Sequence, residues 1–386
     1  MAPQVAIMHE WLETFAGSEK VVEQMLEVYP ESDLFAVVDF LKGESRQMLK
    51  GKTVNTSFIQ RMPFSRRLFR SMLPLMPMAV EQLDFSKYDI ILSSNHAVAK
   101  GVITRADQLH ISYVHTPIRY AWDLQNEYLR EAKLTWGLKS MMARAILHYM
   151  RMWDRLAADR VDVFVANSHY VADRIRKTYR RDAEVIHPPV DVESFTFTPE
   201  KEDYYVAASR MVPYKRIDLI VEAFRKMPEK TLVVIGDGPE YKKIAALAGK
   251  NVQLLGHVGN DLLRERVRHA KAFLFAADED FGIMPVEAQA CGTPVIAFRR
   301  GGAMETVISG ETGVFFDHQT PESIADAVRR FEKHRSEFDP YRIRAHAERF
   351  SIDRFRRELA QLVDQKWSQF QDKRYQPLEF PESADV

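Results

Sequence analysis

Cysteine is almost absent from this sequence, because the 386 residues contain a single one, Cys291. One cysteine forms no disulfide within the chain, so a disulfide-rich secreted scaffold and a cysteine-rich zinc site are both excluded. Long apolar runs are absent too, since no stretch approaches the roughly 20 apolar residues that cross a bilayer. The N-terminus enters a strand-like run at residues 5–8 without the features of a signal peptide. These absences predict a cytoplasmic protein.

An excess of charge of either sign is also absent, because Lys and Arg together number 54 and so do Asp and Glu. A nucleic-acid-binding protein usually carries a basic excess, so the balance predicts no nucleic-acid partner. No Gly-x-Gly-x-x-Gly follows the first predicted strand, which leaves a nicotinamide-dependent dehydrogenase without support. The motifs Gly-x-Ser-x-Gly and His-Glu-x-x-His are missing as well.

Short apolar runs do alternate with helical patterns along the whole chain. The runs are often β-branched and end in Gly, Ser, Asn or Asp, as buried parallel strands do. Because the length suits two domains, we predict an α/β protein with two Rossmann-like, doubly wound parallel-sheet domains facing a central cleft. The predicted strands are residues 5–8, 34–40, 54–58, 90–93, 111–114, 161–166, 184–187, 204–208, 232–235, 252–255, 272–276, 294–297 and 314–316.

The domain boundary is predicted at His187-Pro188-Pro189, because two successive prolines continue neither a sheet ladder nor a helix interior. This divides the chain into an N-terminal domain, 1–187, and a C-terminal domain, 188–350. A helix over 351–373 is expected to return to the first domain. Residues 374–386 are expected to form a flexible tail.

The most informative segment is Ala-Asp-Glu-Asp-Phe-Gly-Ile-Met-Pro-Val-Glu-Ala at residues 277–288. A predicted strand ends there, and a helix is expected to begin near Pro285, since proline suits the first helical position. Amides at a helix N-terminus have no intrahelical partner and lie at the positive end of the helix dipole. We predict that the amides of Phe281, Gly282 and Ile283 bind a diphosphate and sugar hydroxyls.

Two glutamates flank that turn, Glu279 and Glu287, and their carboxylates are acceptors for sugar and ribose hydroxyls. The alternative interpretation is an acidic helix turn that serves only the dipole. Asp278-Glu279-Asp280 also reads as Asp-x-Asp, a pattern that binds a metal diphosphate in some transferases. We nevertheless predict no catalytic metal, because two cations of a second cluster can take the metal's place.

That second cluster is Ser209-Arg210-Met211-Val212-Pro213-Tyr214-Lys215, directly after another predicted strand. In open parallel sheets, ligands lie at the carboxyl ends of the strands. We predict that Ser209, Arg210 and Lys215 bind the diphosphate, and that the two cations neutralise charge on the leaving group. The alternative is a pair of solvated surface cations.

Two glycine-containing turns complete the candidate phosphate site. Gly236-Asp237-Gly238-Pro239 follows the next predicted strand, and Gly236 and Gly238 permit a close backbone approach to a ligand. In the first domain, the amides of Gly17 and Ser18 are predicted to face the phosphates at the start of a helix. The alternative at that place is a plain helix N-cap at Ser18.

A basic and apolar segment, residues 60–74, is the unusual surface feature of the first domain. Its cations stand beside phenylalanine and leucine and almost without acidic neighbours, which suits anionic lipid headgroups or a lipid-diphosphate acceptor. We predict contact with the inner face of the plasma membrane here, the alternative being an arginine-decorated core helix and loop. The cations are Arg61, Arg66, Arg67 and Arg70.

The pattern Glu-x-Phe-Gly-x-x-Pro-x-Glu-Ala at 279–288, followed by Gly-Thr-Pro-Val at 292–295, resembles the signature of the retaining glycosyltransferases of family 4, which have the GT-B fold. The resemblance implies transfer of a sugar, with retention, from a nucleotide-diphosphate donor to an acceptor alcohol. It implies no cofactor beyond the donor. It also places the acceptor side in the N-terminal domain and the sugar nucleotide in the C-terminal one.

The same resemblance implies roles for individual residues. Ser209 to Lys215 is similar to the family's phosphate cradle, and His115 is similar to its donor-sugar histidine. His257 and Val258 fall on a turn that lines the nucleotide base in similar enzymes, although His257 is equally well interpreted as a plain turn residue. Relatives often carry paired glycines where this chain has Ala16-Gly17, and the inference for Gly17 is weaker for that reason.

The nature of the donor is inferred from two other segments. The start His9-Glu10-Trp11-Leu12 and the loop over residues 115–123 are similar to bacterial mannosyltransferases of polysaccharide assembly. The resemblance implies transfer of mannose from GDP-mannose to a glycan or lipid-linked saccharide in surface polysaccharide synthesis. A UDP-sugar donor, an epimerase of the same fold and a non-catalytic sugar-nucleotide-binding protein remain open.

Overall fold

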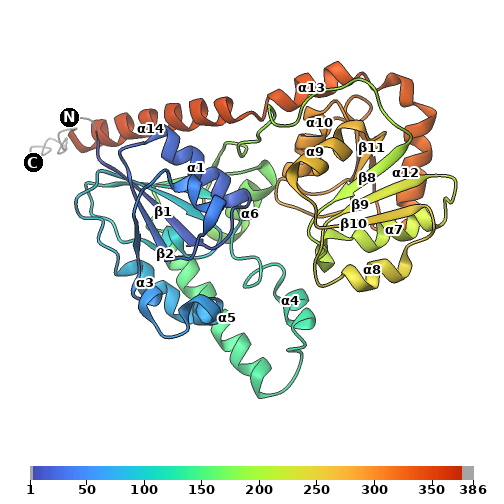
Figure 1. Cartoon of the computed structure of the whole chain (residues 1–386). Coiled ribbons are helices and arrows are strands. Elements are labelled where there is room, and N and C mark those ends of the chain that lie inside the picture. Colours follow the sequence, from blue (N-terminus) through green and yellow to red (C-terminus); the bar gives the residue numbers. More distant parts are fainter. Residues whose placement is uncertain (1–2, 376–386) are drawn as a thin grey trace, which may run out of the picture. The chain divides into compact units, whose positions relative to one another are not determined.

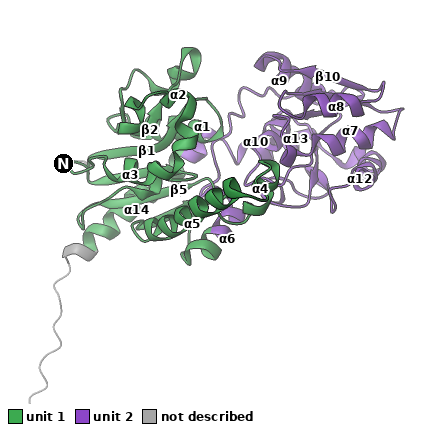
Figure 2. Cartoon of the chain, turned by 90° about the horizontal axis from the view of Figure 1, so that it is seen from below, with its two compact units in different colours: residues 1–165, 175–184, 356–386 green, residues 166–174, 185–355 purple. Residues whose placement is uncertain are grey.

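The computed structural model describes residues 3–375, which form two compact units (Figure 1, Figure 2). Unit 1 consists, among the described residues, of 3–165, 175–184 and 356–375. Unit 2 consists of residues 166–174 and 185–355. The boundary predicted after residue 187 stays a prediction of domain organisation; it lies close to the change of unit at residue 185.

Unit 1 is built on a seven-stranded sheet with the order β3-β2-β1-β4-β5-β6-β7. Strand β1 lies in its interior and pairs in parallel with both β2 and β4. The strands are β1 (Val5–Leu12), β2 (Asp33–Asp39), β3 (Val54–Thr56), β4 (Ile90–Asn95), β5 (Leu109–Val114), β6 (Val163–Ala166) and β7 (Glu184–Val185). Its helices are α1 (Gly17–Val28), α2 (Ser65–Leu68), α3 (Met76–Glu81), α4 (Gln125–Glu131) and α5 (Leu138–Ala158), together with the C-terminal part of α6 (His169–Tyr179).

Unit 2 is built on a six-stranded sheet with the order β10-β9-β8-β11-β12-β13. Its strands are β8 (Tyr204–Ala208), β9 (Thr231–Ile235), β10 (Val252–Gly256), β11 (Ala272–Phe275), β12 (Val295–Phe298) and β13 (Gly313–Phe316). Its helices are α7 (Ile217–Arg225), α8 (Tyr241–Leu247), α9 (Asn260–His269), α10 (Ile283–Ala290), α11 (Ala303–Thr306), α12 (Pro321–Lys333) and α13 (Pro340–Glu348).

The second sheet is covered on both faces, as a doubly wound fold requires. Alternate residues of β8 point to opposite faces: Tyr205 belongs to the core with α7 and α12, whereas Val206 belongs to the core with α9 and α10. Every strand predicted from the sequence is present, with its ends shifted by a few residues. The expectation of two doubly wound parallel-sheet domains is therefore confirmed.

The C-terminal helix α14 (Ile352–Tyr375) is longer than the expected 351–373 at its far end. From residue 356 onward it belongs to unit 1, where Arg356 Nε donates to Gln24 Oε1 at 2.7 Å and Lys366 pairs with Glu184 at 2.9 Å. Of the tail predicted over 374–386, residues 374–375 end this helix and the remainder lies outside the described residues.

Both sheets have a point where the strand order reverses, between β1 and β4 in unit 1 and between β8 and β11 in unit 2. In open parallel sheets the loops after such strands diverge and leave room for a ligand at the carboxyl ends. The candidate residues of unit 2 follow β8, β9, β10 and β11, and those of unit 1 follow β1 and β5.

Candidate functional site

The two clusters with the most specific sequence patterns meet in unit 2. Lys215 ends the short 3-10 helix that follows β8, and Glu279 lies in the turn that follows β11. The Lys215 Nζ forms an ion pair with the Glu279 Oε1, and the two residues are 64 positions apart in the chain. Each side chain is about four-fifths buried, with 18% of its surface exposed. Arg210 lies in the same turn as Lys215 and is exposed to solvent.

The turn after β8 lies so close to the turn after β9 that only glycine fits at Gly236 and Gly238. A Cβ on Gly236 would lie 1.9 Å from the Ser209 carbonyl oxygen, and one on Gly238 would lie 2.4 Å from that of Met211. The two turns are also joined by a hydrogen bond of 2.9 Å from the Met211 N–H to the Asp237 carbonyl. Both glycines thus allow a close approach of the backbone after β9 to the turn over Ser209–Lys215. Contact of Gly236 and Gly238 with a ligand stays a prediction.

The turn after β11 is held by its two aspartates. Asp278 pairs with Arg300 at 2.9 Å, and Asp280 pairs with Arg174 at 2.7 Å. Both aspartates of the Asp-x-Asp pattern therefore form ion pairs with arginines. Glu279, which lies between the two aspartates, forms its ion pair with Lys215. Within residues 3–375, no three His, Cys, Asp or Glu side chains are grouped so as to hold a metal ion.

A second glycine pair packs against this turn. A Cβ on Gly302 would lie 2.2 Å from the Phe281 Cα, and the Gly302 N–H donates to the Glu279 carbonyl at 2.8 Å. Gly301, with φ +66°, would place a Cβ 2.3 Å from that same carbonyl oxygen. Gly301 and Gly302 follow β12, so this contact joins the turns after two neighbouring strands, β11 and β12.

Helix α10 begins earlier than predicted. Its first residue is Ile283, with Gly282 at the N-cap in a left-handed conformation (φ +82°), so Pro285 is the third helical residue and not the first. Proline is tolerated there because the N–H groups of the whole first turn lack intrahelical partners. Glu287 consequently lies one residue beyond that turn, and it is buried with 5% of its surface exposed. The amides of Phe281, Gly282 and Ile283 remain at the helix start as expected.

The turn after β10 continues the same edge of the sheet. The Gly236 N–H donates to the Gly256 carbonyl at 2.8 Å, which links the turns after β9 and β10. His257 is exposed, and Val258 packs partly against the core on the α10 face. Turns after four neighbouring strands, β10, β9, β8 and β11, thus carry the predicted residues of unit 2 along one edge.

In unit 1, the predicted residue His115 follows β5 and is half-buried. Its Nε2 lies 2.8 Å from the Ser94 Oγ, whose oxygen is also 3.1 Å from the His9 Nδ1. Burial and the neighbouring His96 and His9 rings lower the pKa of His115 to about 3, so its imidazole is neutral near neutral pH. His9 was noted in the sequence only as part of a resemblance, and Ser94 was missed because nothing local distinguishes it.

Helix α1 starts at Gly17 with Ala16 as its N-cap residue, so the alternative of an N-cap at Ser18 is wrong. The Ser18 hydroxyl donates to the Glu19 carboxylate at 3.0 Å, and the Ala16 N–H donates to the same carboxylate at 3.1 Å. Glu19 therefore caps the helix from its third position, as in a capping box. Binding of phosphate by the amides of Gly17 and Ser18 stays a prediction.

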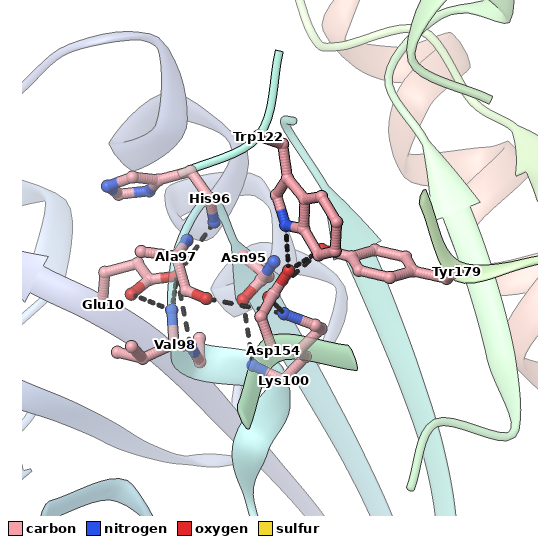
Figure 3. Close-up of polar contacts among 10 residues, drawn as sticks. Glu10, Asn95, His96, Ala97, Val98, Lys100, Trp122, Asp154 and Tyr179 are labelled. Carbon is pink, nitrogen blue, oxygen red and sulfur yellow. Dashed lines mark hydrogen bonds and ion pairs between the residues drawn. The ribbon is translucent and has the colours of Figure 1, made fainter. Parts of the chain in front are cut away.

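The Glu10 side chain, fully buried, holds the chain that follows β4 (Figure 3). Its carboxylate accepts the backbone N–H groups of residues 96–99 at 2.7–3.1 Å. Burial alone would raise the pKa of Glu10, but His96 and these amides outweigh it and lower the pKa. A carboxylate of the protein thus fills a nest of amides of the kind that elsewhere binds anions.

Figure 3 also shows the buried carboxylate of Asp154, which connects α5 to three other segments through polar contacts. Asp154 pairs with Lys100, accepts from the Trp122 Nε1 at 2.7 Å and accepts from the Tyr179 hydroxyl at 3.0 Å. Lys100 and Asp154 are both 0% exposed. Trp122, which lies in the loop over residues 115–123, therefore donates its indole N–H to this buried network.

The arginine-rich segment 60–74 consists mainly of short helices of unit 1: the end of a 3-10 helix (Phe58–Arg61), α2 and most of a second 3-10 helix (Phe69–Leu75). Its four cations, Arg61, Arg66, Arg67 and Arg70, are exposed. Phe64 is exposed to 78% with φ +57°, whereas Phe69 is buried. Among residues 3–375, no helix combines the length and apolar composition needed to cross a bilayer.

Two family models match successive parts of the chain. The model described as Glycosyltransferase Family 4 matches residues 16–194, and the model described as Glycosyl transferases group 1 matches residues 192–349. The chain belongs to the family 4 glycosyltransferases. In this family 4 glycosyltransferase, the first match contains Gly17, Ser18 and His115, and the second contains all candidate residues of unit 2.

Curated relatives resemble this family 4 glycosyltransferase over part of their length. A GDP-mannose-dependent alpha-(1-6)-phosphatidylinositol monomannoside mannosyltransferase of Mycolicibacterium smegmatis is 30% identical over 206 residues, covering 45% of this chain and 54% of the relative. A D-inositol 3-phosphate glycosyltransferase of Mycobacteroides abscessus is 28% identical, covering 45% of each chain. The chain therefore spans about half the length of the curated relatives it matches.

Solved structures resemble the chain over nearly its whole length. HepE of Anabaena, in complex with UDP and glucose, has a TM-score of 0.68 at 17% identity and covers 94% of this chain and 99% of its own. Sucrose-phosphate synthase of Thermosynechococcus elongatus has a TM-score of 0.71 at 17% identity, covering 95% and 100%. At this identity the likeness concerns the fold, and it confirms the GT-B architecture.

Proposed function

We propose that this chain transfers a hexose, with retention, from a nucleotide-diphosphate donor to a hydroxyl of a saccharide or lipid-linked acceptor. The observation that carries the proposal is the ion pair of Lys215 with Glu279 at the carboxyl ends of adjacent strands. It joins the phosphate-cradle pattern to the glutamate pattern at the switch point of unit 2, inside the segment matched by the group 1 model.

In the proposed mechanism, the bond between the anomeric carbon and the donor phosphate breaks while a bond to the acceptor oxygen forms on the same face. The acceptor hydroxyl gives its proton to the departing phosphate, so no side chain becomes a covalent nucleophile. Arg210 and Lys215 stabilise the negative charge that grows on the leaving diphosphate. Glu279 orients Lys215 and accepts a hydrogen bond from the sugar, and Glu287 accepts one from the ribose.

Mannose from GDP-mannose is the donor that we favour. The His9-Glu10-Trp11-Leu12 start supports this choice by resemblance, and so does the relative whose name specifies GDP-mannose. A UDP-sugar is the alternative, since HepE was solved in complex with UDP-glucose. No metal is assigned a role, because Arg210 and Lys215 are proposed to neutralise the diphosphate in its place.

Donor choice can be tested by thermal unfolding of the full chain across a panel of sugar nucleotides. We expect GDP-mannose at 100 times its Kd to stabilise the chain by about 2.7 kcal/mol, with UDP-sugars giving much less at the same concentration. Transfer of labelled mannose to lipid-linked saccharides should follow. Stabilisation by a UDP-sugar alone would refute the mannose assignment. Tight binding with neither transfer nor donor hydrolysis would favour the non-catalytic alternative.

We further propose that unit 1 binds the anionic inner surface of the plasma membrane, where a lipid-linked acceptor would be located. The first support comes from α5 and the turn before it, which leave large apolar side chains in solvent: Trp136 is 92% exposed and Leu138 is 70% exposed. Further exposed side chains follow at helical spacing on the same face, and they are Met141, Met142, Tyr149, Met152 and Leu156.

The second support is the charge around this stripe. Residues 132–153 contain no Asp or Glu but do contain Lys133, Lys139, Arg144 and Arg151. The α5 helix also contacts the arginine-rich segment around Phe69–Leu75. An apolar stripe beside cations matches an anionic bilayer, whereas a second copy of the chain would bring like charges together.

Membrane binding can be tested by flotation with vesicles that contain phosphatidylglycerol or only phosphatidylcholine. We expect binding to the anionic vesicles, and at least tenfold weaker binding after the triple change Trp136→Ser, Leu138→Ser and Met142→Ser, because each large apolar side chain contributes about 1.5–3 kcal/mol when buried. The control is Leu262→Ser with Met304→Ser, which removes exposed apolar side chains from unit 2. Equal flotation of both variants, or dimerisation through α5 without flotation, would contradict the proposal.

A further inference from the structure

Two aromatic side chains meet where the strand order of unit 1 reverses. Trp11 lies near the end of β1, and His96 directly follows β4, which is the parallel neighbour of β1. Their ring centroids are 4.6 Å apart, and the two ring planes are perpendicular at 90°. Open parallel sheets bind their ligands at the carboxyl ends of the strands beside such a reversal. The pair therefore lies where a ligand of unit 1 is expected.

The backbone of His96 is held by the buried carboxylate that precedes Trp11 in β1. The Glu10 Oε1 accepts the His96 N–H at 2.9 Å, and the same carboxylate accepts the next three amides. In Figure 3 the His96 ring points away from these amides. Glu10 thus fixes the chain after β4 next to the end of β1, while the His96 ring stays outside the buried polar contacts.

The polar atoms of both rings lack a partner within the protein. Trp11 and His96 are half-buried, and in the part of the chain that the structure describes, no residue hydrogen-bonds to the indole N–H or to the imidazole nitrogens. Partly exposed aromatic rings with a few unpaired polar atoms are typical of ligand sites. A saccharide matches this surface, because its C–H groups pack on aromatic rings and its hydroxyls both donate and accept.

The neighbours of the pair indicate an acceptor and not the donor. On one side, the His96 ring lies 6.4 Å from the ring of His115, the residue predicted to contact the donor sugar. On the other side, the Trp11 ring lies 5.9 Å from that of Phe69 in the arginine-rich segment, and Arg70 lies over the Phe69 ring. A saccharide on these two rings would lie between the predicted donor contact and the segment predicted to meet anionic lipid.

We propose that Trp11 and His96 bind the acceptor saccharide, with a sugar ring packed against the Trp11 indole and a sugar hydroxyl hydrogen-bonded to the His96 imidazole. This inference rests on the proposed function and names the residues that recognise its acceptor. It also narrows the acceptor class: a sugar ring satisfies both side chains, whereas an alkyl alcohol leaves the His96 nitrogens or the indole surface without a match. Neither residue forms a covalent bond or transfers a proton in the reaction.

Steady-state kinetics of the full chain test the histidine. The acceptor probe is whichever of a panel of soluble methyl glycosides supports the fastest transfer. We expect His96→Phe, which keeps a ring beside Trp11 and removes both nitrogens, to raise the KM for this glycoside roughly three- to tenfold, as for one lost hydrogen bond. The KM for the sugar nucleotide should change less. The control is His148→Phe, since His148 is exposed on α5 of the same unit and should alter neither KM.

Two substitutions test the tryptophan. Trp11→Leu removes the aromatic ring and should raise the KM for the glycoside, whereas Trp11→Phe keeps an aromatic ring and should recover most of the loss. Because Trp11 also packs against the core of unit 1, thermal unfolding and the KM for the sugar nucleotide report whether each variant is folded. A larger effect on the KM for the sugar nucleotide than on that for the glycoside, in both His96→Phe and Trp11→Leu, would overturn the acceptor assignment.

Binding of the same methyl glycosides without a donor separates this inference from the proposed function. Ligand-observed nuclear magnetic resonance should show binding to the wild-type chain and to His148→Phe, and much weaker binding to His96→Phe and Trp11→Leu. A chain that binds a glycoside in this pattern but transfers no sugar would refute the proposed function alone. A chain that transfers sugar, with binding and glycoside KM unchanged in both variants, would refute the acceptor site alone. A wild-type chain that neither binds nor uses any glycoside of the panel would refute both.

Discussion

Replacing Lys215 by alanine is expected to lower kcat/KM for glycosyl transfer by two to three orders of magnitude. The Lys215 Nζ contacts Glu279 at the ends of adjacent strands, where the leaving diphosphate is proposed to gain charge. A preorganised donor aimed at developing charge contributes roughly 2.7–4 kcal/mol to the stability of the transition state. The loss should fall mainly on kcat, because this interaction is stronger in the transition state than with the bound donor. Arg210→Ala should behave similarly, since Arg210 lies in the same turn.

The control for this experiment is Lys243→Ala. Lys243 lies on α8 of the same unit and pairs with Glu240 at 2.8 Å on the surface. Its removal should leave kcat/KM within about twofold, because surface pairs contribute little. Glu279→Gln provides a second comparison, since it weakens the hold on Lys215 without removing the cation. Near-normal turnover in both Arg210→Ala and Lys215→Ala would refute the phosphate cradle, provided that thermal unfolding shows both variants folded.

Replacing Asp154 by leucine is expected to destabilise unit 1 by about 3–5 kcal/mol, because it leaves the buried Lys100 ammonium without a counter-charge. Both side chains are 0% exposed, so water cannot replace the lost partner. The change also removes the acceptor of the Trp122 and Tyr179 hydrogen bonds. Urea unfolding, followed by a signal specific to unit 1, should show a lower midpoint with an unchanged slope.

The double change Lys100→Met with Asp154→Leu should recover much of that loss. A buried ion pair replaced by apolar side chains of similar size is often neutral in stability, since neither charge then needs a partner. The matched surface comparison is Arg155→Ala, which breaks an exposed pair with Asp159 in unit 1 and should cost less than about 1 kcal/mol. If Asp154→Leu alone costs no more than Arg155→Ala, the buried pair is not a determinant of stability.

The strands and their order along the chain could be predicted because hydrophobic periodicity is a local property. Each buried strand is a short apolar run bounded by residues that favour turns, so every predicted strand is present in the structure. Element ends were less predictable: α10 begins at Ile283 and not near Pro285, since the N-cap is a left-handed glycine that adopts φ +82°. Proline is compatible with several positions of a first turn, and its presence does not identify which one.

The candidate site could be predicted as a set of turns but not as a set of contacts. Arg210, Lys215 and Glu279 each follow a strand, and this alone placed them at the carboxyl ends of a parallel sheet. The pairing of Lys215 with Glu279 joins positions 64 residues apart, and that of His9 with Ser94 joins positions 85 apart. Such pairs depend on which strands become neighbours, and strand order is decided by packing over the whole sheet.

By itself, the sequence determined the fold class, the family and the chemistry present at each strand end, because these depend on residue type and short-range spacing. Only the tertiary structure decided that Asp278 and Asp280 bind arginines while Glu279 contacts Lys215. It likewise decided that the Glu10 carboxylate accepts hydrogen bonds from backbone amides and that His115 is connected to His9 through Ser94. The physical reason is that a polar group's partner is the group nearest to it after the sheet has formed.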